Sequence, residues 1–371
     1  MASGNLDTSI TEPAIGGLRF AFLCMLLLLG ACASQPKPKE APKPAPLKDK
    51  SADTDYRLGE VELKLKAAAE FEQDGQRVIA SSVIDTAAGM LPDDFTRERQ
   101  YLDVVKAGIW ARDGEGREPA KASELLAAVI SAAQKANDRR LLADAYVGRV
   151  LVELGEGDTL KAKQTGEAAL KEFEAVEAHV QAVWTARNLA YQFLDAERAP
   201  AAKAFAERAF QTTVRLDDDE LLVQVGTDVA RVFLAAGDNA EPYFEKAYEA
   251  AYRLRDSGWG WRNVVIAAAA DAYFINDDKE ACIRWGNRLR DRDRGLMPSL
   301  RDSGLWAEDY ITVLAQYAFA SDEVSPKNAR AIESAELAVK AIDSLDEAEQ
   351  PDWKELKEKL VSGLLQPPRK K

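Results

Sequence analysis

Few side chains in this sequence are of the types that perform catalysis. There is one histidine, His179, and there are three cysteines, so a His-based metal site, a Ser-His-Asp triad and a Cys/His cluster all lack members. The acidic tract at 217–220 precedes the apolar run at 221–223, which is typical of a helix N-cap with an acidic first turn rather than of a metal site. We therefore expect a protein that is not an enzyme, with no catalytic residues, no metal site and no cofactor.

Cys32 is the residue at which covalent chemistry is expected. Arg19 precedes an unbroken apolar run at 20–29, and two small residues follow the run, which is the layout of a secretory signal. A spanning helix needs about 20 apolar residues, so this run is too short for a membrane anchor. The Leu-Gly-Ala-Cys sequence at 29–32 resembles a bacterial lipobox, in which cleavage before the cysteine leaves its thiol to carry a lipid. We expect residues 1–31 to be a lipoprotein signal peptide and Cys32 to be acylated, for example with palmitate.

The segment after Cys32 has the composition of a stiff tether. Prolines at 36, 38, 42, 44 and 46 remove backbone donors and favour extended polyproline II. At about 3.1 Å per residue, the stretch at 35–50 would hold a folded domain up to roughly 50 Å from a lipid surface. We expect residues 32–54 to form a lipid-attached Pro/Lys-rich linker.

The residues next to Cys32 also indicate where in the cell the protein is expected to be located. Ala33 and Ser34 resemble the positions that follow the cysteine in lipoproteins sent to the outer membrane, because the retaining aspartate is absent. Residues 31–33 read Ala-Cys-Ala, which also fits ordinary signal cleavage and would release a soluble periplasmic protein. We expect a lipid-anchored outer-membrane protein that faces the periplasm, with a soluble periplasmic protein as the alternative.

Charge and cysteine content further limit the kinds of partner and of covalent cross-link that the protein is expected to have. The 371 residues include 49 Lys and Arg against 62 Asp and Glu, a net charge of -13, which argues against nucleic acid as a partner. Once the signal is removed and Cys32 is acylated, Cys282 remains alone in an apolar helix pattern. No disulfide is expected, and Cys282 is interpreted as a buried structural thiol.

The rest of the chain has the pattern of an all-α domain. From about residue 56 to 365 the apolar residues recur at three- and four-residue intervals, and no strand-like alternation persists. Glycine and proline interrupt the pattern about every 15 to 20 residues in many places, which gives ordinary helix lengths. We expect a helical-repeat domain at 55–366 and a basic tail at 367–371.

Small residues recur with a spacing that indicates repeated helical hairpins. Alanines seven residues apart are expected on one face of the second helix of each pair: Ala162 and Ala169, Ala202 and Ala209, Ala240 and Ala247, Ala331 and Ala338. Between them, or at the equivalent place, lies a packing position filled by Gly166, Ala206, Phe244, Trp285 or Ala335. Small residues let helices approach closely, and large ones fill the next gap.

This arrangement resembles the tetratricopeptide repeat. The best match is Leu189, Ala190, Phe193, Ala202, Ala206 and Ala209, at that family's own spacing. Anchor alanines at 162, 202, 240, 281 and 331 are 40, 38, 41 and 50 residues apart, whereas the family's unit is 34, so the repeats are degenerate. The resemblance implies an α-solenoid of antiparallel helical hairpins, preceded by the signal peptide and the Pro/Lys-rich tether.

The resemblance also implies a concave groove that is lined by the first helix of each pair and holds a partner protein. The groove positions of the family fall on Arg149, Arg187, Tyr191, Arg231, Asn263 and Tyr273. The arginines would form a positive ladder for an extended acidic segment of an envelope protein. The Lys and Asn pattern of chaperone-tail-binding members is not reproduced.

Two other segments carry residues of interest. Trp259 and Trp261 are expected in a flexible turn before a helix, where they form either a partner contact or a satellite core. Arg284 and Arg288 begin an arginine-rich stretch with interleaved aspartates, which is typical of a salt-bridged solvent face.

Two classes of function fit the sequence. The favoured one is a noncatalytic lipoprotein scaffold that binds a protein partner in an envelope assembly and touches the membrane only through its lipid. The other is a periplasmic α/α-toroid carbohydrate-active enzyme, which would need two carboxylates roughly 5 to 10 Å apart. No such pair can be singled out, and alanine-lined hairpins favour open stacking.

We predict that Cys32 carries a fatty acid. Metabolic labelling should incorporate the acyl chain into the wild-type protein but not into Cys32→Ala, because the thiol is the attachment point. The variant should remain unprocessed or be released into the periplasm. Wild-type protein that incorporates no label would contradict the prediction.

Overall fold

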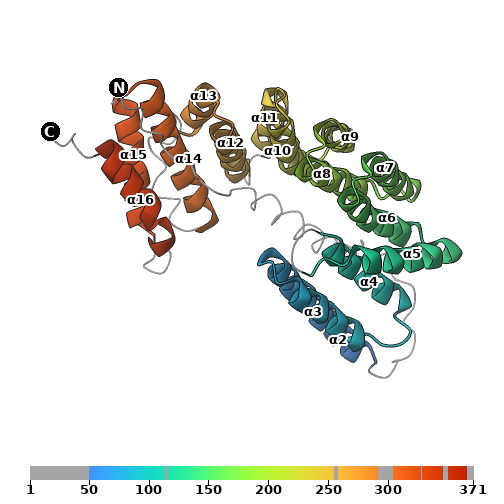
Figure 1. Ribbon diagram of the computed structural model, residues 1–371. Coiled ribbons are helices and arrows are strands. Elements are labelled where there is room, and N and C mark those ends of the chain that lie inside the picture. Colours follow the sequence, from blue (N-terminus) through green and yellow to red (C-terminus); the bar gives the residue numbers. More distant parts are fainter. Residues whose placement is uncertain are drawn as a thin grey trace, which may run out of the picture. The chain divides into compact units, whose positions relative to one another are not determined.

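The part of the chain that the structure describes is built from helices. The computed structural model describes residues 50–112, 116–254, 258–290, 304–326, 328–345 and 350–365 (Figure 1). Within these ranges lie fifteen α-helices, one 3-10 turn and one short π-helical segment, and no strand. The all-α expectation is confirmed. The expected signal peptide, Cys32 and the basic tail lie outside the described residues.

The helices follow one another as antiparallel pairs. Consecutive helices pack together, for example α2 on α3, α6 on α7 and α14 on α15, as expected of a helical repeat. The bounds are α2 (Lys50–Gln73), α3 (Arg77–Met90), α4 (Thr96–Ala111), α5 (Pro119–Ala136), α6 (Arg139–Gly155), α7 (Thr159–Ala175), α8 (His179–Asp195), α9 (Ala199–Leu216), α10 (Asp219–Ala235), α11 (Glu241–Arg253), α12 (Gly258–Ile275), α13 (Lys279–Arg290), α14 (Gly304–Val324), α15 (Ala329–Asp343), η2 (Gln350–Trp353), α16 (Lys354–Leu360) and η3 (Val361–Leu365). Helix α2 begins inside the stretch expected to be linker.

A left-handed backbone conformation ends successive helices at a constant interval. Between residues 137 and 237, positive φ angles occur at 137, 157, 177, 197, 217 and 237; outside this series they occur at Gly75, Gly116 and Asp277. In most of these turns the following N–H donates to the carbonyl five residues back, as Arg198 does to Phe193 at 2.7 Å, which satisfies a carbonyl at the helix end. The interval is the length of one helix with its turn, so every second position completes a pair. This regularity explains why the anchor alanines at 162, 202 and 240 recur once per pair.

Aspartates begin several of the helices. The side chains of Asp138, Asp158 and Asp218 each accept a hydrogen bond from the backbone N–H three residues on, at 3.0 to 3.1 Å. Such a cap satisfies one of the free N–H groups of the first turn. The N-cap interpretation of the acidic tract at 217–220 is therefore confirmed at Asp218.

The small residues singled out in the sequence lie where helices pack. All eight recurring alanines are at most 1% exposed, and Ala206, Phe244, Trp285 and Ala335 are fully buried. Gly148 shows how close the helices come, because a Cβ atom there would lie 2.9 Å from Cδ2 of Leu126 on α5. Cys282 is also fully buried, and burial raises the pKa of its thiol to about 12, as expected of a structural cysteine.

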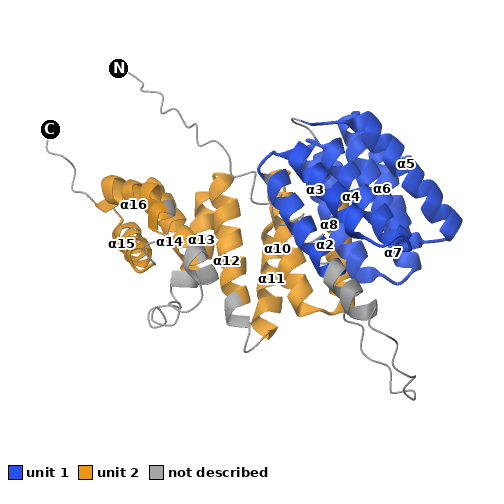
Figure 2. Cartoon of the chain, turned by 90° about the horizontal axis from the view of Figure 1, so that it is seen from below, with its two compact units in different colours: residues 1–202 blue, residues 203–371 orange. Residues whose placement is uncertain are grey.

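The chain divides into two compact units (Figure 2). Unit 1 covers residues 1–202 and contains α2 to α8, and unit 2 covers residues 203–371 and contains α10 to α16. The division falls within α9. Unit 2 has an alanine-rich core to which α10 to α15 contribute. In unit 1, one cluster lies among α2, α3 and α4, and another among α4, α5 and α6.

One local expectation is wrong. Helix α12 begins at Gly258, so Trp261 lies in the first helical turn rather than in a turn before the helix. Its half-buried side chain packs against the core of unit 2, which favours the satellite-core interpretation for this tryptophan. The side chain of Trp259 lies outside the described residues.

Replacing Ala202 or Ala209 with Leu should destabilise the fold by about 1 to 3 kcal/mol, because the added carbons overpack a helix contact that leaves no room. Ala128→Leu on the exposed side of α5 is the matched control and should stay within about 0.5 kcal/mol. The free energy of unfolding of all three variants is measured by chemical denaturation. Unchanged stability at both buried positions would show that they are not at the packing seam.

Candidate partner-binding surface

The first helices of successive pairs form a layer in each unit. In unit 1, α6 contacts both α4 and α8, and in unit 2, α12 contacts both α10 and α14. We call the exposed and half-buried residues of α4, α6 and α8 the first-helix face of unit 1. They include the half-buried Asp103, Asp144, Trp184 and Tyr191 and the exposed Asp195. The first-helix face of unit 2 is the corresponding side of α10, α12 and α14, which carries Arg231 and Asn263.

The two predicted groove arginines of unit 1 are engaged within the protein. Arg149 donates from Nε to Glu153 Oε1 at 3.2 Å and from Nη1 to Ser123 Oγ at 3.0 Å. Arg187 is only 1% exposed, and its Nη1 donates to Asn188 Oδ1 at 3.0 Å. Arg187 is therefore buried, whereas the half-buried Arg149 is held by neighbours that repeat spacing does not reveal.

Arg187 also stacks on aromatic rings of its own helix. Its guanidinium carbon lies 4.9 Å from the ring centroid of Tyr191 and 5.8 Å from that of Trp184. The three positions are three or four residues apart and so lie on one side of α8. Both aromatic side chains are half-buried, which leaves part of each ring on the first-helix face.

The predicted groove residues of unit 2 lie in two environments, one partly exposed and one buried. Arg231 and Asn263 are half-buried on first helices, as expected of surface positions. Tyr273 is 4% exposed, and its hydroxyl donates to Glu241 Oε2 at 2.7 Å. Its hydroxyl is therefore used inside the unit, whereas Arg231 and Asn263 remain partly exposed.

The first-helix face of unit 1 carries three aspartates that the sequence did not single out. Burial raises the pKa of Asp103 on α4, with Lys106 opposing, and raises that of Asp195 at the end of α8, with Arg112 opposing. Asp144 on α6 has the largest shift. Burial raises its pKa to about 7 against the opposing charge of Arg97. Carboxylates in such surroundings are stabilised when a cation approaches.

The repeat pattern could not have pointed to these residues. Asp103 lies eight residues after the N-cap of α4, and Asp144 lies six residues after the N-cap of α6, so the two are not at equivalent repeat positions. Asp195 is the last residue of α8 and has no repeat signal either.

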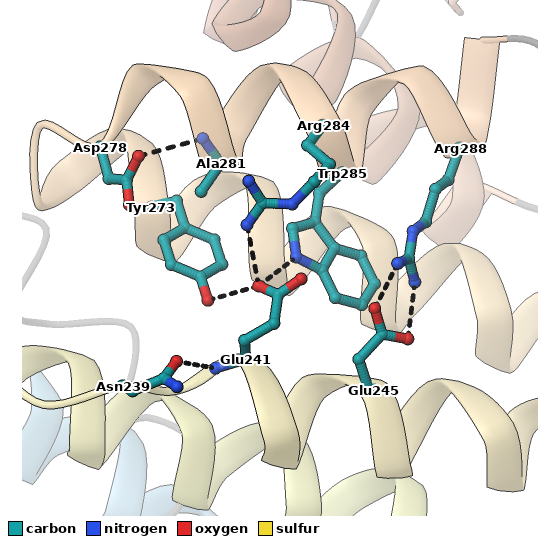
Figure 3. A network of polar contacts seen from close by, with 9 residues as sticks. All are labelled: Asn239, Glu241, Glu245, Tyr273, Asp278, Ala281, Arg284, Trp285 and Arg288. Atoms are coloured by element: carbon teal, nitrogen blue, oxygen red, sulfur yellow. Dashed lines mark hydrogen bonds and ion pairs between the residues drawn. The ribbon is translucent and has the colours of Figure 1, made fainter.

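A polar network joins three helices of unit 2 (Figure 3). Glu241 lies in the first turn of α11, and its Oε2 accepts hydrogen bonds from Tyr273 at 2.7 Å, Arg284 at 3.1 Å and Trp285 Nε1 at 3.1 Å. Burial acts to raise the pKa of Glu241, but these three donors outweigh it and lower the pKa. The carboxylate therefore stays ionised near neutral pH, which does not suit it to donate a proton in catalysis.

The second half of the network fixes α13 to α11. Arg288 forms two hydrogen bonds to the carboxylate of Glu245, and its guanidinium carbon lies 3.9 Å from the ring centroid of the buried Trp285. Arg284 and Arg288 thus pair with glutamates of another helix, and the interleaved aspartates at 291 and 293 lie outside the described residues. The network explains how these helices hold together and leaves the first-helix faces as the candidate surfaces.

Glu241→Gln should destabilise the protein by about 1 to 3 kcal/mol at pH 7, because a charged acceptor of three hydrogen bonds is lost. A lowered pKa contributes stability above the unfolded-state pKa of about 4.3 and loses it as pH falls through the folded-state pKa. The difference between wild type and variant should therefore shrink below about pH 4.

Glu249→Gln is the control, since its ion pair with Lys246 is exposed and should contribute less than about 1 kcal/mol. The free energy of unfolding of each variant is measured by urea denaturation at pH 7 and at acid pH. A Glu241→Gln protein as stable as wild type at pH 7, or a difference that grows at acid pH, would contradict the account of the network.

Other kinds of site are not found in the described part of the chain. No helix there is long and apolar enough to cross a membrane. The same residues contain no group of three His, Cys, Asp or Glu side chains placed to hold a metal ion. Models of known protein families give no match to this sequence, and neither do curated protein sequences. What the protein does is therefore inferred from its own residues.

Proposed function

We propose that this protein is a noncatalytic scaffold that binds a partner protein through its first-helix faces. The layering of the helix pairs carries the proposal. Hydrophobic and ionic contacts join neighbouring helices, while partly exposed polar and aromatic side chains such as Trp184, Tyr191 and Asn263 remain on the first helices. Aromatic side chains with part of the ring exposed are frequent anchors in protein interfaces.

In this proposal the helix pairs are degenerate tetratricopeptide-like repeats, with one pair to each repeat. The protein is a lipoprotein, held to the outer membrane by Cys32 and facing the periplasm, and the Pro/Lys-rich linker sets the distance between the lipid and the helical domain. Its partner belongs to an envelope assembly. The lipobox-like motif and the proline spacing of the linker support this placement.

The enzyme alternative has less support. A glycoside hydrolase needs a protonated acid and a second carboxylate across the scissile bond. Asp144 has a suitably raised pKa, but the carboxylate that acts on it, Asp138, caps α6 and pairs with Arg97. Because Asp138 is engaged in this way, Asp144 fits electrostatic recognition better than it fits this reaction.

Photo-crosslinking tests the proposal. Benzoylphenylalanine placed at Trp184 or Asn263, one in each unit, should give discrete adducts in intact cells, with a partner that mass spectrometry identifies. The same residue at Gln164, exposed on the second helix α7, is the control and should not give those adducts. Identical adducts from all three positions, or none from the first-helix positions, would contradict the proposal.

A further inference from the structure

Helix α8 carries two aromatic side chains on one side. Trp184 and Tyr191 are seven residues apart, which is about two helical turns, so they leave α8 in nearly the same direction. Both are half-buried, so part of each side chain is exposed on the first-helix face of unit 1. Because a helix advances about 1.5 Å per residue, the two positions are about 10.5 Å apart along the helix axis.

Arg187 supports both rings from their buried side. It is 1% exposed, and its guanidinium carbon lies 4.9 Å from the ring centroid of Tyr191 and 5.8 Å from that of Trp184. Its Nη1 donates to Asn188 Oδ1 at 3.0 Å, which fixes the guanidinium in turn. A buried cation beside both rings limits their rotamers, so a ligand that stacks on them costs little additional side-chain entropy.

The neighbouring helix α6 adds one residue beside each ring. Asp144 and Trp184 both lie six residues after the N-cap of their helices, and Leu151 and Tyr191 both lie thirteen residues after it. Helices α6 and α8 are in contact, so equivalent positions on them are about 8 to 10 Å apart. Trp184 therefore has a half-buried carboxyl group to one side, and Tyr191 has a half-buried apolar side chain.

We propose that these two rings bind an extended segment of the partner in which prolines stand three residues apart. This inference rests on the proposed function and names the kind of segment that the first-helix face of unit 1 holds. Polyproline II has three residues per turn and advances about 3.1 Å per residue, so prolines three apart lie on one side of the segment, about 9.3 Å from each other. That distance matches the separation of the two aromatic positions, and each proline stacks on one ring.

The residues of α6 suit the same segment. A polyproline II chain has no internal hydrogen bonds, so the N–H groups between its prolines need acceptors. Asp144 beside Trp184 offers carboxyl oxygens to one of them, and Leu151 beside Tyr191 offers apolar contact to the second proline. A stacked sugar would instead need polar groups for its hydroxyls at both rings, which Leu151 does not supply.

The Pro/Lys-rich linker of this chain has a different proline spacing. Its prolines at 36, 38, 42, 44 and 46 are separated only by even numbers of residues, so no two of them stand three apart. Prolines six apart share a side of the segment but are about 18.6 Å from each other, which exceeds the separation of the rings. The partner, rather than the linker, therefore supplies the segment.

Fluorine NMR of the purified full-length protein, labelled with 5-fluorotryptophan, tests the inference. Of the seven tryptophan resonances, the one that disappears in Trp184→Phe belongs to Trp184. The twelve-residue peptide (Pro-Ala-Ser)4 should shift this resonance in a saturable way. A peptide of the same composition with prolines at positions 1, 3, 7 and 9 should bind about fivefold more weakly, because it stacks on one ring at a time.

Two substitutions at Tyr191 and one matched control separate stacking from other effects. Tyr191→Ala should weaken binding of (Pro-Ala-Ser)4 about tenfold, and Tyr191→Phe, which keeps the ring, should recover most of that affinity. Tyr252→Ala is the control and should bind like wild type. Tyr252 is exposed on the second helix α11, and its ring centroid also lies near an arginine, 4.4 Å from the guanidinium carbon of Arg262. Circular dichroism verifies folding, and Tyr191→Leu stands in if Tyr191→Ala is not folded.

Equal affinity for the two peptides, no saturable shift of the Trp184 resonance, or equal weakening by Tyr191→Ala and Tyr252→Ala would overturn the proline-segment inference. Tighter binding of a peptide with the linker sequence 35–50, or of chitotetraose, would overturn it in favour of the linker or of a glycan. The scaffold proposal has its own measurement, because it fails only if the crosslinkers at Trp184 and Asn263 give no adducts.

Discussion

Close helix approach through small residues is the constraint on which the other features of this structure depend. The alanines of the second helices are almost completely buried, and Gly148 allows the side chain of Leu126 to lie where a Cβ would otherwise stand. Because contacts this close leave no space for long side chains, polar and aromatic groups of the first helices are left on the partly exposed side. The candidate binding surface is thus a consequence of how the core packs.

The turns set the lengths of successive helices, and the ionic contacts join helices of neighbouring pairs. Left-handed residues at a constant interval give successive helices similar lengths, so corresponding side chains recur once per helix pair. Across the pairs, contacts such as Glu241 with Arg284 and Glu245 with Arg288 connect second helices that are not consecutive in the sequence. Since these arginines and glutamates satisfy one another, they contribute to cohesion rather than to recognition.

The sequence predicted this architecture well where packing depends on residue size. Buried alanines seven residues apart, the cap at Asp218 and the buried Cys282 all agree with the structure. The regular turn interval was missed because Glu177 and Glu197 adopt positive φ without glycine, which local composition does not signal. Candidate site residues were predicted less well, because the repeat spacing reveals neither the burial of Arg187 nor the pairing of Arg149 with Glu153 in the same helix and with Ser123 on α5.

Thiol reactivity tests the central claim, that the small residues form the packing seam while the first helices present the surface. In a background in which Cys24, Cys32 and Cys282 are replaced by Ala, single cysteines would replace Ala169 and Ala247 on second helices and Asp144 and Asn263 on first helices, and their rates of modification by a maleimide would be compared. We expect the two second-helix cysteines to react only when the protein unfolds and the two first-helix cysteines to react readily in the folded state. Rapid modification at Ala169 and Ala247 in the folded protein would contradict the account.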